Sequence, residues 1–425
     1  MHPNVPASPP RRSRPRLRLR TGGLAAAVLA ALWAATALLL PACTAPAVPP
    51  TPQATPSDCG AQQAAPCLRL IGAVALPHRW NVGGTAVGGL SGVDYDAAHD
   101  QYLLLSDDRS AVDPARAYTA RIRYTADTLA PPTFTGVITL RGPSGQPYAP
   151  RLRAVDGVEV PDPEAVRWLP GGGAFLWTSE GDFARGFGPA LRATRAADGA
   201  LLRDYALPAA FAPAKGEKSA PPAKGDKSGP RDNATLEGLA LSPDGRTAWL
   251  AMEGPWMQDG PRATPASGGA PVRITAIDVE TGRALRQIAY PLDPVPHASP
   301  VPGGYTTNGV SEILADGTDH LLVLERAYTL GVGTSVRLYR IALASASDTL
   351  GLPALAAGNH TPAAKALVAD FAQLGLPHVD NIEGMAWGPP LPPEAGGARV
   401  LVFVSDDNFN PAQTTQFIAA EYRVH

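Results

Sequence analysis

The sequence predicts an all-β protein, a β-propeller of five blades with four strands each, and two observations carry this prediction. Gly and Pro account for 43 and 46 of the 425 residues, so turns interrupt the chain often enough to exclude a long helical bundle or coiled coil. A strand-turn-strand pattern also recurs five times at nearly constant spacing. Repeated units of four antiparallel strands are the blades of a propeller.

One anchor position opens the first strand of each unit. The anchors are separated by 73, 73, 74 and 72 residues, and they are Ser91, Glu164, Glu237, Ser311 and Glu383. A Gly, Pro or Asp turn connects each first strand to a second apolar run, and this run ends in an acid. The closing acids are Asp107, Glu180, Glu253, Glu325 and Asp406. Two further strand-like stretches complete each unit.

The fifth unit ends one strand short. Its strands IEGMAW, VLVFVS and TTQFIAAEYRV run to the end of the sequence. The run LRLIGAVAL, residues 68–76, precedes the first unit and has no partner of its own. We therefore expect this N-terminal strand to be the outer strand of the last blade and to close the ring. Six blades are the alternative, if residues 141–162 contain strands.

Residues 1–42 have the order of an export signal. Six Arg lie between positions 11 and 20, residues 24–40 are uncharged, and small residues follow. The end of this segment, Leu40-Pro41-Ala42-Cys43, resembles the bacterial lipobox, in which the Cys becomes the lipidated first residue. We therefore expect a lipoprotein of the bacterial cell envelope with Cys43 as its lipidation site. Ordinary secretion and an uncleaved N-terminal membrane anchor are the alternatives.

Three further segments follow from composition. Residues 43–66 are a Pro/Ala/Thr-rich tether, and the propeller domain is expected over 67–425. Residues 211–233 contain AKGEKS and AKGDKS with four of the five Lys, which indicates a disordered surface insertion.

Cys59 and Cys67 remain after Cys43, and in an oxidising compartment we expect them to form one disulfide. Two free thiols are the alternative.

The net charge of the chain after residue 42 limits the kinds of partner that it can bind. The formal net charge is −2, but the first 42 residues hold six Arg and no acid, which leaves 30 basic and 38 acidic residues in the rest. An acidic body argues against nucleic acid as partner and fits a protein that holds cations. We expect a monomer that contacts a membrane only through its N-terminal lipid or signal anchor.

The anchors and the closing acids are expected to meet. In an antiparallel hairpin the start of the first strand and the end of the second lie at the same end, so all ten positions gather on one face around the axis. Eight of the ten are carboxylates, and Asp108, Asp162, Asp182, Glu312, Asp380 and Asp407 lie beside them in the sequence. Crowded carboxylates raise each other's pKa or require compensating cations, and oxygen ligands without Cys or clustered His favour Ca²⁺ or Mg²⁺ over zinc. The alternative is a structural role, in which each acid accepts backbone N–H bonds or pairs with Arg109, Arg167 or Arg326.

Nucleophilic catalysis has little support in the sequence. The segment Gly89-Leu90-Ser91-Gly92 is not a G-x-S-x-G elbow, and it begins a propeller strand instead of a strand-to-helix turn. None of the His residues recurs with the blades.

Several phrases of the sequence resemble one family. GGLSGVDYD, YLLLSDDR, EGLALSPDGRTAWLAMEGP, LLVLERAY, DNIEGMAWGP and VFVSDDNFN are similar to the bacterial phytase-like proteins, the esterase-like activity of phytase family. The resemblance extends from about residue 68 to the C-terminus. The chain departs from the family at Pro163-Glu164-Ala165, where a Gly normally follows the Glu, and at the Lys-rich insertion.

The resemblance implies an extracytoplasmic hydrolase, a Ca-dependent phosphoric ester hydrolase acting on a small-molecule ester. In true β-propeller phytases, calcium ions bound by carboxylates activate water and neutralise the substrate phosphate. On this interpretation Arg109 and Arg326 clamp phosphate oxygens, Asn408 orients the ester, and Glu237 and Glu383 are the candidate catalytic residues. The metal ligands would be Asp107, Glu164, Glu180, Glu237, Glu253, Glu383, Asp406 and Asp407. The alternative is a non-catalytic propeller that serves as a binding module of the cell envelope.

Overall fold

The computed structural model describes residues 66–212 and 228–424, which contain strands and short 3-10 helices. Twenty of the strands form five antiparallel sheets of four strands each, and β2 (Asn81–Val82) pairs with β3 (Thr85–Ala86) in a separate small hairpin. The 3-10 helices are η1 (Arg151–Arg153), η2 (Phe183–Arg185), η3 (Ala209–Phe211), η4 (Met257–Asp259), η5 (Leu343–Ser345), η6 (Phe371–Gln373) and η7 (Pro393–Ala395). No helix among the described residues is long and apolar enough to cross a membrane.

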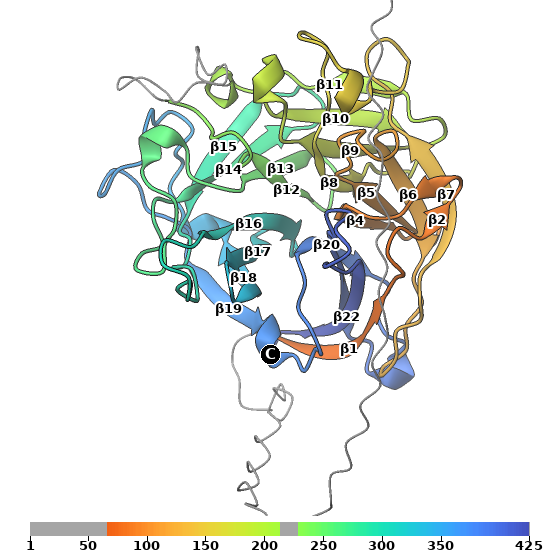
Figure 1. Cartoon of the computed structure of the whole chain (residues 1–425). Helices are drawn as coiled ribbons and strands as arrows, with labels where there is room; N and C mark the ends of the chain where they lie inside the picture. The colour runs from red at the N-terminus through yellow and green to blue at the C-terminus, as the bar shows by residue number, and fades with distance from the viewer. Residues whose placement is uncertain (1–65, 213–227, 425) are drawn as a thin grey trace, which may run out of the picture. The chain divides into compact units, whose positions relative to one another are not determined.

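The five sheets are the predicted blades (Figure 1). Blade one is β4 (Leu90–Asp96), β5 (Gln101–Ser106), β6 (Arg116–Arg121) and β7 (Thr133–Thr139). Blade two is β8 (Pro163–Trp168), β9 (Ala174–Ser179), β10 (Ala190–Arg195) and β11 (Leu201–Asp204). Blade three is β12 (Leu236–Leu241), β13 (Thr247–Met252), β14 (Val272–Asp278) and β15 (Ala284–Tyr290). Blade four is β16 (Thr306–Ala315), β17 (His320–Thr329), β18 (Gly333–Ala342) and β19 (Lys365–Asp370). Blade five is β20 (Ile382–Gly388), β21 (Arg399–Ser405), β22 (Gln416–Arg423) and β1 (Cys67–Ala75).

The ring closes as the sequence predicts. β1 pairs antiparallel with β22, from Cys67 opposite Arg423 to Ala75 opposite Gln416, so the N-terminal strand completes blade five (Figure 1). The innermost strands β4, β8, β12, β16 and β20 contact one another in order, and β20 contacts β4. Residues 141–162 form one isolated bridge and η1 but no strand, so the six-blade alternative is wrong.

Strand alternation buries both faces of each blade. Leu103 and Leu105 of β5 pack toward blade two beside Trp177, while Leu104 on the opposite face packs toward blade five beside Val402. Because successive side chains point to opposite faces of a sheet, a continuous apolar run fills two neighbouring interfaces at once. The same arrangement joins the other blades.

Each innermost strand carries a β-bulge at its anchor. In blade three Leu236 lies opposite Met252 and Gly238 opposite Ala251, so Glu237 is an extra residue without a partner. The register shifts at the same place in the other four blades. A bulge changes the direction of a side chain relative to the regular strand. The bulges therefore set the direction in which the anchor side chains point.

A buried ion pair joins the five blades at the axis. Arg167 Nη2 lies 2.9 Å from Glu312 Oε2, and the two side chains are almost completely buried. The Arg167 guanidinium donates hydrogen bonds to the carbonyls of Val93, Val166, Ile313 and Met385, on β4, β8, β16 and β20. Glu312 Oε1 accepts from Leu239 N of β12 at 2.9 Å. The pair therefore bonds to all five innermost strands.

This placement corrects one expectation, because Glu312 was expected among the acids of the mouth. Glu312 lies beside the bulged anchor Ser311, so its side chain points to the axis and away from the acidic face. Burial raises the pKa of Glu312 to about 8, and the charge of Arg167 opposes this increase. Arg167 accordingly has the structural role that was its alternative.

The N-terminal predictions lie outside the described residues. These are the signal over 1–42, the lipidated Cys43, the tether over 43–66 and Cys59, so export, lipidation and the Cys59–Cys67 disulfide stay predictions. The predicted insertion over 211–233 is only partly described. Phe211 is buried and contacts the Trp256 ring, so the packed body extends past the N-terminal limit predicted for the insertion.

We predict that Arg167→Met lowers the free energy of unfolding by about 3 to 5 kcal/mol, because the buried Glu312 carboxylate loses its partner. Denaturant unfolding followed by fluorescence measures this loss. Arg123→Met breaks the exposed pair with Asp100 and serves as control, with an expected loss below about 1 kcal/mol. The double variant Arg167→Met, Glu312→Leu should recover part of the loss, and equal losses in Arg167→Met and Arg123→Met would contradict the axial role.

Candidate metal centre in the propeller mouth

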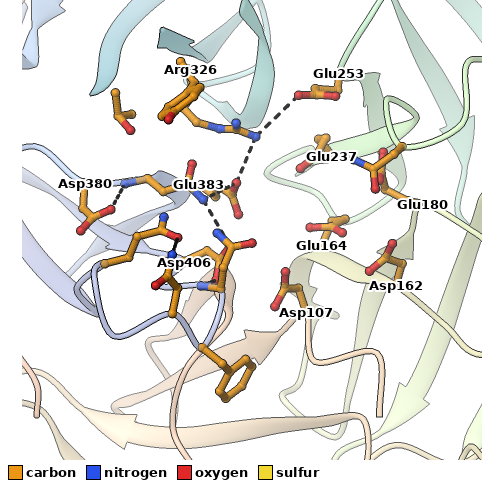
Figure 2. Close-up of a pocket in the computed structure, with 18 of the residues that line it drawn as sticks. Asp107, Asp162, Glu164, Glu180, Glu237, Glu253, Arg326, Asp380, Glu383 and Asp406 are labelled. Atoms are coloured by element: carbon orange, nitrogen blue, oxygen red, sulfur yellow. Dashed lines mark hydrogen bonds and ion pairs between the residues drawn. The ribbon is translucent and has the colours of Figure 1, made fainter. Parts of the chain in front are cut away.

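A pocket of about 870 Å³ lies at the mouth of the propeller and is lined mainly by acidic side chains at its base (Figure 2). Glu164, Glu237 and Glu383 enter it from the bulges of β8, β12 and β20. A second set enters directly after the second strands β5, β9, β13 and β21; these residues are Asp107, Glu180, Glu253 and Asp406. The structure therefore brings together seven of the eight predicted metal ligands.

Asp407, the eighth predicted ligand, does not line the pocket. Its side chain is fully buried, and its Oδ1 accepts hydrogen bonds from Gly89 N at 2.9 Å and Phe409 N at 3.1 Å. The structure therefore corrects its role from metal ligand to support of the following loop.

This loop holds Asn408 at the pocket. Asn408 and Phe409 are two consecutive non-glycine residues in the left-handed region, with φ of 47° and 50°. Their backbone N–H groups donate to the carboxylates of Asp406 and Asp407. Side-chain acceptors thus stabilise an uncommon backbone conformation. Asn408 is exposed and lines the pocket, where the sequence predicted a substrate-orienting residue.

In blade four, the residue at the position equivalent to the closing acids of the other blades is not acidic. The register of blade four places Glu325 opposite Val310, as Met252 lies opposite Leu236 in blade three. The position that follows is acidic in the other blades and is Arg326 in blade four. The prediction that Glu325 contributes to the acidic mouth is therefore wrong.

Glu325 points away from the mouth and has a structural role. Its carboxylate accepts hydrogen bonds from Tyr290 Oη at 2.7 Å, Asn308 Nδ2 at 2.8 Å and Lys365 Nζ at 2.7 Å. These three donors satisfy a buried carboxylate within the interior.

Two groups of three carboxylates could each hold a metal ion. Asp162, Glu164 and Glu180 form the first triad, and one oxygen of each lies within 4.8 Å of the others. Glu180, Glu237 and Glu253 form the second triad under the same limit. Glu180 belongs to both, so the two triads are adjacent. In the sequence, Asp162 is a neighbour of the anchor Glu164 and not one of the repeated positions. Its place before Glu164 is the signal that could have identified it as a candidate metal ligand.

The other expected neighbours have structural partners. Asp108 pairs with Arg116 at 2.7 Å, and Asp182 pairs with Arg185 at 2.9 Å. Asp380 accepts hydrogen bonds from the backbone N–H groups of Asn381 and Thr414.

The triads hold excess negative charge. Burial raises the pKa of Glu164, Glu180 and Glu237 well above the ordinary value, and neighbouring carboxylates raise it further. Burial raises the pKa of Asp162 to about 6, although Arg109 opposes the shift. Carboxylates with such shifts stay protonated or bind a cation. Their oxygen donors, without Cys or His, fit Ca²⁺ or Mg²⁺.

Two arginines contact this acidic base, and Figure 2 shows one of them, Arg326. Arg326 Nη2 lies 3.0 Å from Glu383 Oε1 and 3.6 Å from Glu253 Oε1. Burial opposes its charge, but Glu383, Glu253 and Glu237 raise its pKa. Arg109 Nη1 lies 3.0 Å from Asp162 Oδ2, and Nη2 lies 3.9 Å from Asp182 Oδ1. Both predicted substrate-binding arginines thus line the pocket and already have acidic partners.

Fold and site together define a five-bladed propeller with an acidic mouth, whose carboxylate triads could hold a metal ion. The family described as Phytase-like, esterase-like activity of phytase, matches residues 85–409, and the chain belongs to this family. No curated protein matches the chain.

Three solved structures give distant similarities. An endo-arabinase from Bacteroides thetaiotaomicron VPI-5482 has 12% identity over 78% of this chain and 93% of its own, with a TM-score of 0.41. A structure titled Dos1 propeller has 6% identity over 83% and 95%, with a TM-score of 0.31. A calcium-binding protein, regucalcin, from Agrobacterium tumefaciens str. C58 has 13% identity over 80% and 93%, with a TM-score of 0.33. At these values none of them informs the site.

We predict that the melting temperature of the metal-free protein falls as pH rises from about 4 to about 6. A carboxyl whose folded pKa exceeds its unfolded pKa leaves stability intact below the unfolded value and lowers it as pH rises through the folded value. For Asp162 this window runs from 3.8 to about 6, and burial shifts the pKa of the glutamates in the same direction. Calorimetric melting across this range tests the trend, and added calcium should reverse the fall near neutral pH.

Glu180→Gln is the matched variant for this measurement. It removes the carboxylate that both triads share, so the metal-free variant should melt above wild type at about pH 8 and respond weakly to calcium. A pH-independent melting temperature, with no effect of calcium, would contradict the electrostatic description of the site.

Proposed function

We propose that the protein is an exported, calcium-dependent phosphoric ester hydrolase that acts through the mouth of the propeller. The observation that carries this proposal is the pair of buried carboxylate triads that share Glu180, with Arg109 and Arg326 at the same pocket. Family membership supports a hydrolase, and the acidic body supports a small-molecule substrate instead of nucleic acid.

The two triads would hold the cations. Asp162, Glu164 and Glu180 offer one set of oxygen ligands, and Glu180, Glu237 and Glu253 offer the other. A bound divalent cation supplies a Lewis acid that lowers the pKa of a coordinated water and compensates the charge of an anionic ester. The raised pKa values of Glu164 and Glu180, which result from burial and then from the neighbouring carboxylates, support this role.

The arginines would bind the phosphoryl oxygens. A guanidinium presents donors in a planar fork that suits phosphate oxygens. Glu383 accepts a hydrogen bond from Asn381 Nδ2 at 3.0 Å and contacts Arg326, so we assign it the positioning of Arg326. Glu237 belongs to a triad and remains the candidate for orienting the attacking water. Asn408 at the rim is suited to orient the ester.

The structure offers no support for Ser91 as an acyl nucleophile. Its side chain is buried and does not line the pocket. The location in the cell envelope, the lipid at Cys43 and the monomeric state belong to this proposal as expectations from the sequence.

We predict chelator-sensitive hydrolysis of a phosphate ester by the purified protein. The substrates are p-nitrophenyl phosphate, the bis-ester, a short acyl ester and phytate, each with calcium and with chelator. Glu180→Gln and Glu237→Gln should lower kcat by roughly 100-fold, because each removes a charge that holds the cation in place. Glu325→Gln is the matched control, because its buried carboxylate lies outside the pocket; calcium affinity should not change.

The pattern of turnover separates the alternatives. Hydrolysis of the acyl ester alone would contradict the phosphoesterase and favour an esterase. Absence of turnover on every substrate, with calcium still raising the melting temperature, would favour the non-catalytic binding module.

A further inference from the structure

Blade four extends beyond the other blades at the mouth. Its strands β16, β17 and β18 have ten residues each, while the three inner strands of every other blade have six to eight. In the other blades the second strand ends just before the closing acid, but β17 continues through Arg326 to Thr329. The additional length of β17 therefore lies on the same side as the acidic base.

One face of this extension continues the pocket wall. Arg326 and Tyr328 are two residues apart on β17, so their side chains share a face about 7 Å apart. Tyr328 lies opposite Thr307 of β16 and Thr334 of β18. All four of these residues line the pocket. The wall thus passes from a cation at the base to uncharged side chains at the rim.

An exposed aromatic pair completes this wall. Tyr305 precedes β16 and is 61% exposed, and Tyr328 is 36% exposed. Their ring centroids are 6.3 Å apart at an interplanar angle of 38°, and both line the pocket. Ring surface left open to solvent inside a pocket is suited to contact with a ligand.

We propose that Tyr305 and Tyr328 bind an aromatic ring of the substrate. The inference rests on the proposed function, since the phosphoryl group would lie at Arg326 and the triads. The substrate class is then an aryl phosphate ester and not a compact polyanion. Its ring would lie beside Tyr328, two residues along β17 from Arg326. Beyond Arg326, a polyanion would meet Thr307, Tyr328 and Thr334 on this face of blade four, and these side chains carry no positive charge.

Binding of phosphonates tests this assignment without catalysis. Calorimetry compares phenylphosphonate with methylphosphonate in the presence of calcium, for wild type and the double variant Tyr305→Ala, Tyr328→Ala. We expect wild type to bind the phenyl compound about tenfold more tightly and the double variant to bind both alike. The double variant Tyr305→Phe, Tyr328→Phe keeps the rings and should keep the preference. Val301→Ala, an exposed apolar residue outside the pocket, is the matched control.

The outcomes separate this inference from the proposed function. A phenyl preference that depends on the two rings supports the inference even if no ester is hydrolysed, in which case only the hydrolase proposal fails. Hydrolysis of phenyl phosphate and methyl phosphate with equal kcat/KM overturns the aromatic site and leaves the hydrolase proposal intact. A phenyl preference that survives in the alanine double variant, or no binding of either phosphonate, also overturns the inference.

Discussion

The axial ion pair between Arg167 and Glu312 is the interaction on which the rest of this propeller depends. Its hydrogen bonds reach all five innermost strands, so it fixes the blades relative to one another just where their side chains converge. A buried pair of charges gives little net stability compared with an apolar replacement, but loss of one partner is costly. The pair therefore specifies the geometry of the ring more than it stabilises the chain. That geometry allows seven carboxylates from four blades to meet in one pocket.

The acidic mouth opposes folding electrostatically, and the structure limits this cost in two ways. Arg326 and Arg109 compensate part of the charge through ion pairs with Glu383, Glu253 and Asp162. Burial and repulsion raise the pKa of the remaining carboxylates, so protons compensate another part in the metal-free protein. A protein that needed these acids only for its fold would pair each one, as Glu325 is paired. Glu180 accepts a hydrogen bond from Thr235 N, but among the described residues Glu164, Glu180 and Glu237 have no ion-pair partner, and they are the strongest indication of a cation site.

Blade four breaks the symmetry of the ring. It has Ser311 and Arg326 at the two positions that are acidic in blades two, three and five, and its three inner strands are the longest of their kind. The pocket consequently has an acidic side over blades two and three and a side of Arg, Thr and Tyr over blade four. Under the proposed function this asymmetry would orient an ester, because its charged and its apolar parts would meet different walls.

The sequence by itself predicted five blades, the strand that closes the ring and the face on which the anchors gather, because each depends on a repeat with a period near 73 residues, and the structure excluded the alternative of six blades. Tertiary structure decided which neighbouring side chain enters the pocket. Side chains alternate between faces, so the register between paired strands shows that Arg326 and not Glu325 is equivalent to Glu253, and Glu312, which follows the bulged anchor, turns to the axis. Asp407 turns into the interior and Asp162 joins a triad for equally local reasons. The physical reason is that a repeat in sequence records which strands are equivalent, whereas the register between paired strands sets the direction of each side chain.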